Sequence, residues 1–203
     1  AIAFATLLVC LQQGWGASSY FTEAATGANI VRGPWVLGSG PQSWALFALN
    51  VAVTAITFAC LNGLAAVGEE FGWRGVLQHH LIERMGFWRG VAVLGFVWGI
   101  WHVPVNLAGY NYSDAPVWGA LVAFPVELVA VSFIMAWLTI RARSFWPAVL
   151  MHGSGNGIED GVVSSIQLVT GVAPLTADYV QLAITICLAI ACAAMTPRQA
   201  VSS

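Results

Sequence analysis

The sequence predicts an all-α fold, a polytopic transmembrane helical bundle with about six spans. Of the 203 residues, 59% are hydrophobic, and the mean hydropathy of the chain is +0.78. Only 8% of the residues are charged, whereas a soluble domain carries about 25%. We therefore expect residues 1–203 to form a single integral membrane domain surrounded by lipid.

The apolar segments give the expected order of spans, because a membrane-crossing helix needs about 20 mostly apolar residues. An incomplete first span ends near residue 16, and a polar loop rich in Gly and Ser follows to about residue 43. The chain opens in apolar sequence without Met, so we expect a trimmed N-terminus. A second span is expected from about residue 44 to the acid pair at 69 and 70, and it continues as an amphipathic helix to residue 84. The other spans are expected at residues 89–107, 117–140, from 145 onward and at 179–195.

The arginines predict the orientation of these spans. If the chain crosses the membrane at each span, one side carries Arg84, Arg89, Arg141, Arg143 and Arg198. Among the loop arginines, only Arg32 then lies on the other side. Basic residues in short loops accumulate on the cytoplasmic side. We therefore expect the Arg-rich side and the C-terminus to be cytoplasmic, in a bacterial-type plasma membrane.

Two adjacent acids and an arginine stand at the end of an apolar run. Glu69 and Glu70 follow that run directly, and Arg74 comes four residues after Glu70. Ionisable groups at membrane depth are costly and usually face a protein interior or a water-filled cavity, so they indicate a functional site. Arg74 lies one helical turn beyond Glu70 and can pair with it. This spacing predicts a reactive Glu69, with Glu70 and Arg74 in supporting roles.

Two further polar clusters are expected at the same depth. The segment from Glu69 to His102 is expected to form a helical hairpin that turns near Gly86. Glu69 lies 17 residues before Gly86 and His102 lies 16 after it, so antiparallel helices bring the two level. His152 and Asn156 are four residues apart, which places them on one face of a helix. All four groups can converge in the cytoplasmic half of the bilayer.

Such a cluster supports hydrolysis. A carboxylate in a pocket of low dielectric can act as a general base on water, and a histidine can orient or share that proton. A second histidine and an Asn amide can donate hydrogen bonds to an oxyanion. Other polar residues have simpler interpretations: Glu127 is expected to be a satisfied buried acid, and His79, His80 and Glu83 are expected at the membrane interface.

Three motifs, in matching order and at similar spacing, resemble those of the CPBP family of intramembrane proteases: Glu69-Glu70-x-x-x-Arg74, Trp98-Gly-x-Trp-His-x-Pro and His152-x-x-x-Asn156. That family includes the type II CAAX prenyl endopeptidases and the Abi-like bacteriocin-immunity proteins. The resemblance covers about residues 65–157, which are the expected catalytic core. Trp98 stands where the family pattern usually has Phe, so an aromatic side chain is kept while the shape of the pocket differs.

The resemblance implies an endopeptidase that acts on membrane-anchored or prenylated proteins. It implies that Glu69 activates water, that His102 positions it, and that His152 and Asn156 stabilise the oxyanion. It favours a water activated without a firmly bound metal. If a divalent metal such as zinc is used, its expected ligands are Glu69, His102 and His152.

Two other functions stay open. One is a non-catalytic membrane immunity or scaffold protein of the same fold, although a scaffold has no need for four costly polar groups. The other is a proton-coupled transporter, since buried acids and histidines also build proton relays. The chain shows no repeated half of the kind common in transporters. A net charge of −2 gives no reason to expect a nucleic-acid partner. The sequence leaves the substrate and the oligomeric state open.

Overall fold

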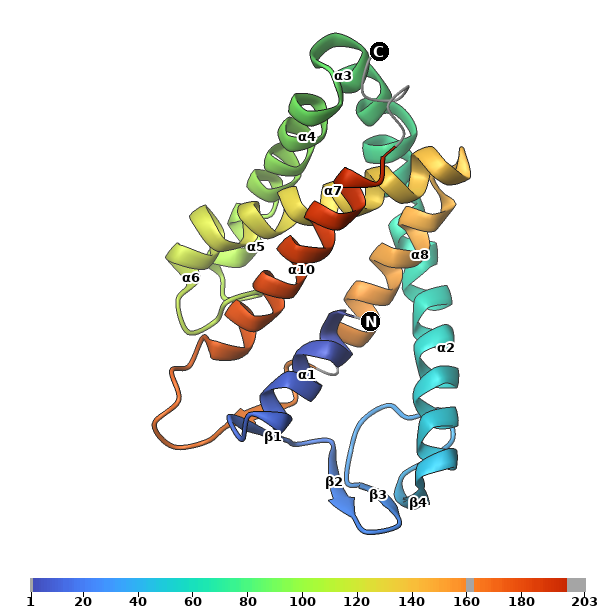
Figure 1. Cartoon of the computed structure of the whole chain (residues 1–203), viewed down its shortest axis with the longest axis vertical. Helices are drawn as coiled ribbons and strands as arrows, with labels where there is room; N and C mark the ends of the chain where they lie inside the picture. Colours follow the sequence, from blue (N-terminus) through green and yellow to red (C-terminus); the bar gives the residue numbers. More distant parts are fainter. Residues whose placement is uncertain (1, 160–162, 197–203) are drawn as a thin grey trace. The chain divides into compact units, whose positions relative to one another are not determined.

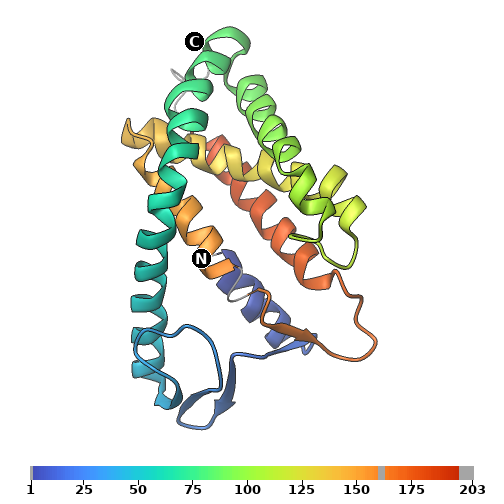
Figure 2. The same cartoon turned by 180° about the vertical axis from the view of Figure 1, so that it is seen from behind.

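A computed structural model, which describes residues 2–159 and 163–196, confirms an all-α membrane helical bundle (Figures 1 and 2). Among these residues, three helical stretches are long and apolar enough to cross a membrane: Trp44–Met85, Pro116–Ala142 and Thr176–Ala194. Two shorter apolar helices, Ile2–Gln12 and Phe87–Trp101, correspond to other expected spans. The structure thus contains fewer full-length candidates than the six spans expected, because several apolar segments are broken into shorter helices.

The helices follow one another in chain order as α1 (Ile2–Gln12), α2 (Trp44–Glu70), η1 (Phe71–Leu77), α3 (Gln78–Met85), α4 (Phe87–Trp101), α5 (Val103–Leu107), α6 (Pro116–Trp118), η2 (Gly119–Ala123), α7 (Phe124–Ala142), α8 (Trp146–Ser154), η3 (Gly155–Glu159) and α10 (Thr176–Ala194). The stretches labelled η are π-helical.

Short strands replace part of the loop that the sequence predicts before residue 43. They are β1 (Gly16–Ser18), β2 (Phe21–Ala24), β3 (Gly27–Ile30), β4 (Gly40–Ser43) and, much later, β5 (Ile166–Leu168). β2, β3 and β4 form an antiparallel sheet in that order, and β1 pairs antiparallel with β5. The expectation of a loop was therefore wrong for the residues in these strands.

The chain divides into two compact units. The first comprises Ala1–Ala66 and Leu150–Gln181, and the second comprises Val67–Val149 and Leu182–Ser203. The candidate residues are split between them, since the acid pair lies in the second unit with His102, whereas His152 lies in the first. A single membrane domain over residues 1–203, with a core at 65–157, stays a prediction.

In the first unit, backbone contact joins α8 to α2. A Cβ atom added at Gly153 would lie 2.4 Å from the backbone nitrogen of Gly63 and 2.7 Å from the carbonyl oxygen of Ala59. No side chain fits at that distance, so glycine at position 153 lets the two helices touch. Small residues serve the same purpose in other membrane bundles.

In the second unit, the hairpin that the sequence predicts is present and turns at Gly86, whose φ of 75° suits glycine. Two pairs at equal distance from Gly86 confirm the expected register. Four residues to either side, a Cβ atom at Gly90 would lie 2.8 Å from the nitrogen of Ile82. Twelve residues to either side, the guanidinium of Arg74 stacks on the ring of Trp98.

The same hairpin packs tightly on α7. A Cβ atom at Gly95 would lie 2.5 Å from the Cα atom of Val129, and one at Gly99 would lie 2.6 Å from the Cα atom of Pro125. The two glycines are four residues apart, the spacing of close helix contacts in membranes. This contact holds α4, which carries His102 at its C-terminal end, against α7.

We expect Gly95→Ala to destabilise the protein by about 1–3 kcal/mol, because the new methyl group would collide with the backbone of α7. Gly68→Ala is a matched control, since a Cβ atom there meets nothing within 4 Å. Ala is favoured over Gly within a helix by up to about 1 kcal/mol, so the control should keep or raise stability. Thermal unfolding in detergent measures both variants, and equal shifts would contradict the close contact.

Candidate active site

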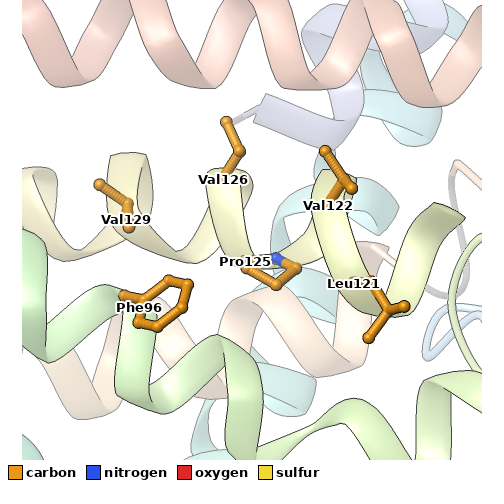
Figure 3. Close-up of a pocket in the computed structure, with 6 residues that line it drawn as sticks. All are labelled: Phe96, Leu121, Val122, Pro125, Val126 and Val129. Atoms are coloured by element: carbon orange, nitrogen blue, oxygen red, sulfur yellow. The ribbon is translucent and has the colours of Figure 1, made fainter.

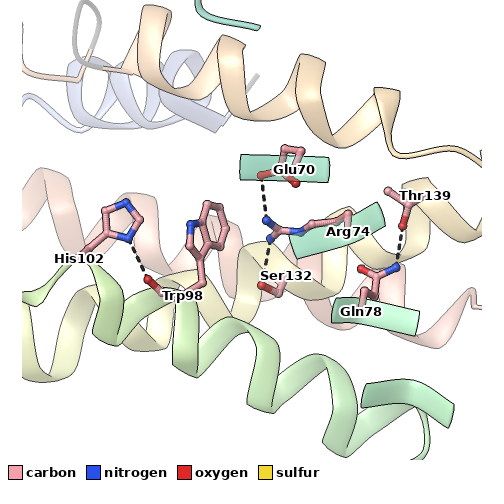
Figure 4. Close-up of polar contacts among 7 residues, drawn as sticks. All are labelled: Glu70, Arg74, Gln78, Trp98, His102, Ser132 and Thr139. Carbon is pink, nitrogen blue, oxygen red and sulfur yellow. Dashed lines mark hydrogen bonds and ion pairs between the residues drawn. The ribbon is translucent and has the colours of Figure 1, made fainter. Parts of the chain in front are cut away.

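A buried ion pair lies at the centre of the second unit. The Arg74 guanidinium donates a hydrogen bond from Nη1 to Glu70 Oε1 at 2.9 Å, and both side chains are fully buried. Its Nη2 donates to Ser132 Oγ on α7 at 3.2 Å (Figure 4). Its Cζ atom lies 4.1 Å from the centre of the Trp98 ring on α4. The pair expected from the spacing is present, and it connects η1 to both neighbouring helices.

The buried polar stripe continues beyond the ion pair. Gln78, four residues after Arg74, donates from Nε2 to Thr139 Oγ1 at 3.0 Å (Figure 4). Sequence analysis missed Gln78, Ser132 and Thr139. The available signals were the repeated spacing of four residues and the presence of hydroxyl side chains within an apolar span.

The segment that carries Arg74 is π-helical over Phe71–Leu77. π-Helical turns are rare and occur frequently at functional sites. This one begins directly after the two acids and ends at the residue before Gln78. The widened turn therefore lies within the polar stripe and separates the acids from the regular helix α3.

Glu69 differs from its neighbour in its surroundings. Its side chain is half-buried, and its Oε2 atom is inaccessible to solvent yet has no hydrogen-bond partner among the described residues. Buried polar atoms are nearly always hydrogen-bonded, so an exception indicates strain or a ligand site. Glu70, by contrast, is fully buried and bound to a guanidinium. Glu70 is thus held by an ion pair through Oε1, whereas Glu69 keeps a buried oxygen with no hydrogen-bond partner among the described residues.

His102 is oriented by the end of its own helix. Its Nδ1 atom lies 2.9 Å from the carbonyl oxygen of Trp98, and a carbonyl can only accept a hydrogen bond. Nδ1 therefore carries the proton, which makes Nε2 the acceptor nitrogen of the neutral ring. The rings of Trp101 and Phe124 lie 4.8 and 5.1 Å from the imidazole, centre to centre, and restrict its rotation.

Contacts near both groups support the expected depth of Glu69 and His102. The rings of Trp73 and Trp101 meet across the hairpin at 6.2 Å. Trp73 lies four residues after Glu69, and Trp101 directly precedes His102. The hairpin is thus in register up to the neighbours of both side chains. Direct contact between Glu69 and His102 stays a prediction.

His152 and Asn156 lie in the first unit. His152 is buried within α8, whereas Asn156 is exposed and lies in η3. The helix changes from α to π between them, so the shared face expected from four-residue spacing is not reproduced in their burial. Their convergence with Glu69 and His102 stays a prediction.

The simpler interpretations of the remaining polar residues agree with the structure. Glu127 is buried and accepts a hydrogen bond from the hydroxyl of Tyr112 at 2.9 Å, which confirms a satisfied buried acid. His79, His80 and Glu83 are exposed beside the hairpin turn, as expected of interfacial residues.

The possible metal ligands do not gather at one place in the described part of the chain. Across residues 2–159 and 163–196, no three His, Cys, Asp or Glu side chains gather closely enough to hold a metal ion. The expected zinc ligands are themselves divided, with Glu69 and His102 in the second unit and His152 in the first. A metal at this site stays a prediction.

A groove of about 230 Å³ lies between α4 and the η2–α7 stretch (Figure 3). The side chains that line it are all apolar: Phe96, Leu121, Val122, Pro125, Val126 and Val129. It offers no group for acid–base chemistry, in contrast to the polar site that contains Glu69 and Glu70.

The fold and the site define an integral membrane protein that buries an acid–arginine pair beside a half-buried glutamate and an oriented histidine. The chain belongs to the type II CAAX prenyl endopeptidase Rce1-like family, whose model matches residues 50–158, just over half of its length. It is also 27% identical over 111 residues to a Methanococcus maripaludis protein named CAAX prenyl protease 2. That match covers 52% of this chain and 40% of the relative. No solved structure matches.

Proposed function

We propose that this protein is an intramembrane endopeptidase that hydrolyses peptide bonds of membrane-associated or lipidated proteins through a water activated by Glu69. One observation carries the proposal: a buried carboxylate oxygen on Glu69, which has no hydrogen-bond partner among the described residues, stands beside a Glu70 whose Oε1 atom is bound to Arg74. Membership of the CAAX prenyl endopeptidase family supports an endopeptidase activity.

The proposed reaction begins with a general-base step. Glu69 Oε2 takes a proton from water while the water oxygen forms a bond to the scissile carbonyl carbon. His102 accepts the second hydrogen bond of that water at Nε2 and so orients its lone pair. The tetrahedral intermediate collapses when the C–N bond breaks and Glu69 returns the proton to the leaving amine nitrogen.

The negative charge on the tetrahedral oxygen needs donors in fixed positions. His152 and Asn156 are proposed for this role, through an imidazole N–H and an amide N–H. Donors of this kind are worth about 2.7–4 kcal/mol each in other hydrolases. Glu70 is unsuited to act as the base, because its charge is already compensated by Arg74 within one helical turn.

The proposed substrate is a prenylated or otherwise membrane-anchored protein. The relative's name supports a prenylated tail, and a site among membrane helices suits a substrate already held in the bilayer. We place the site in the cytoplasmic half of a bacterial-type plasma membrane, with the C-terminus cytoplasmic, since arginines gather at that side. The proposed chemistry uses no metal.

The test uses purified protein in liposomes with a peptide that ends in a prenylated cysteine motif, followed by mass spectrometry. We expect the wild type to cleave it and Glu69→Gln to be slower by about 10²–10⁴-fold, the usual contribution of a general base. Glu83→Gln removes an exposed acid from the same hairpin and should cleave normally.

Normal cleavage by Glu69→Gln would overturn the assigned role. A wild type that cleaves no membrane-anchored peptide, together with a cellular phenotype kept by Glu69→Gln, would favour the immunity or scaffold function instead. Proton flux in liposomes that disappears in Glu69→Gln would favour a transporter.

A further inference from the structure

The segment between β3 and β4, residues 31–39, runs along the first turns of α2 in the first unit (Figure 1). We call it the 31–39 loop. The backbone N–H of Val36 donates to Thr54 Oγ1 at 3.1 Å, and that of Leu37 donates to Asn50 Oδ1 at 2.9 Å. Two side chains of α2 therefore bind the tip of this loop.

The positions of these two side chains give the distance of the loop tip from the start of α2. α2 begins at Trp44, and Asn50 and Thr54 lie six and ten residues further on. At 1.5 Å per residue, they are about 9 and 15 Å along the helix axis from Trp44. Trp44 is 45% exposed, and Trp is enriched at membrane–water interfaces. α2 belongs to the stretch Trp44–Met85, which is long and apolar enough to span a bilayer.

The backbone N–H groups of Val36, Leu37 and Gly38 and the carbonyl oxygen of Gly38 are satisfied by protein. Besides the two bonds to α2, the N–H of Gly38 donates to the carbonyl oxygen of Trp35 at 3.1 Å. The carbonyl oxygen of Gly38 accepts from Asn50 Nδ2 at 2.9 Å and from Gln42 Nε2 at 3.1 Å. Non-helical backbone is tolerated at membrane depth only where protein or a water-filled cavity satisfies it.

The outer side of the loop is apolar. Val31, Val36 and Leu37 are 58%, 46% and 40% exposed. On the neighbouring turns of α2, Leu49 and Ile56 are 54% and 65% exposed. The loop tip therefore continues the same kind of surface that α2 presents to lipid.

The one charge in the loop is drawn away from its tip. Arg32 donates from Nε to the carbonyl oxygen of Ser19 at 3.1 Å and from Nη2 to Ser19 Oγ at 2.6 Å. Its guanidinium also lies 5.2 Å from the centre of the Tyr20 ring. This arrangement holds the cation near the base of the loop, while positions 36 and 37 carry only aliphatic side chains.

We propose that the 31–39 loop dips into the bilayer leaflet at the N-terminal end of α2, where Val36 and Leu37 contact lipid chains. The partner is the lipid bilayer, and the surface is continuous with the lipid-facing side of α2. Asn50 and Thr54 act as internal hydrogen-bond partners that make this irregular segment tolerable away from water.

The test measures the depth of a nitroxide label on the reconstituted protein. The native cysteines, Cys10, Cys60, Cys187 and Cys192, are first replaced by alanine, and single cysteines are then introduced as Val36→Cys or Leu37→Cys. Leu49→Cys is the lipid-exposed control on α2, and Thr26→Cys is the aqueous control in the exposed turn between β2 and β3. Liposomes of phosphatidylcholine and phosphatidylglycerol are used, with oxygen and a water-soluble nickel chelate as relaxation agents.

We expect the ratio of oxygen to nickel collisions at positions 36 and 37 to exceed that at Thr26 by about threefold or more, because the chelate is excluded from hydrocarbon. It should match Leu49 within about a factor of two on the same grounds. Ratios at both loop positions equal to that of Thr26 would overturn the proposal. Asn50→Ala should raise nickel accessibility at position 36, and an unchanged value would exclude Asn50 as the support.

Discussion

Replacing Arg74 with methionine should destabilise the folded protein by about 3–5 kcal/mol, because Glu70 would remain buried without its partner. The guanidinium also binds Ser132 and stacks on Trp98, so the change removes contacts to two neighbouring helices. Denaturant or thermal unfolding in detergent measures the loss. Arg74→Lys should recover only part of it, since an ammonium lacks the planar fork that bridges two acceptors and stacks on a ring.

The matched control removes both charges. Glu70→Leu combined with Arg74→Met should be much more stable than Arg74→Met alone, since replacing a buried ion pair by apolar groups is often neutral. A double variant as unstable as the single one would show that Ser132 and Trp98, rather than the Glu70 charge, dominate the contribution of Arg74. The comparison requires both variants, because the changes in stability caused by mutating interacting neighbours are not additive.

Helical periodicity predicts much of the second unit. The four-residue spacing predicts the ion pair between Glu70 and Arg74, and both partners are found in contact. Equal counts on either side of Gly86 predict the hairpin register, which the stacking of Arg74 on Trp98 confirms. Both predictions concern neighbours along one helix or across one short turn, so residue numbers alone are sufficient.

Contacts between helices that are distant in sequence were not predictable in this way. Ser132 and Thr139 are polar residues in an apolar span, which indicates that each has a partner but not which helix supplies it. Apart from its two glycines, the sequence of the π-helix Phe71–Leu77 has no feature that predicts π-helical geometry. The place of His152 relative to Glu69 depends on packing between the two units, which periodicity does not determine.

The strands before residue 43 were missed for a different reason. Each has only three or four residues, too short to show the alternation that identifies a strand. β4 even contains Pro41 and begins at Gly40, residues typical of turns. What stabilises this sheet is a contact with α2, where Phe47 packs against Ala28 and Ile30. That contact becomes visible only when the tertiary structure is known.

Glu69 and His102 should behave as one catalytic unit in a double-mutant cycle. Each single change, Glu69→Gln or His102→Gln, should lower kcat by about 10²–10⁴-fold, because each removes a part of water activation. The double variant should be no slower than the slower single one, since residues that act on one step are strongly non-additive. Cleavage of the prenylated peptide in liposomes gives kcat and KM for all four proteins.

The unfolding temperature of each variant distinguishes a loss of catalysis from a structural defect. Glu69 Oε2 has no protein partner among the described residues, so Glu69→Gln should unfold at the same temperature as the wild type while it loses activity. Arg74→Met should instead unfold at a lower temperature than the wild type, because its main effect is on stability. If the reductions in kcat caused by Glu69→Gln and His102→Gln instead multiplied in the double variant, the two residues would act on separate steps. Joint activation of water by the pair would then be wrong. A similar loss of stability in Glu69→Gln would mean that both acids of the pair are structural.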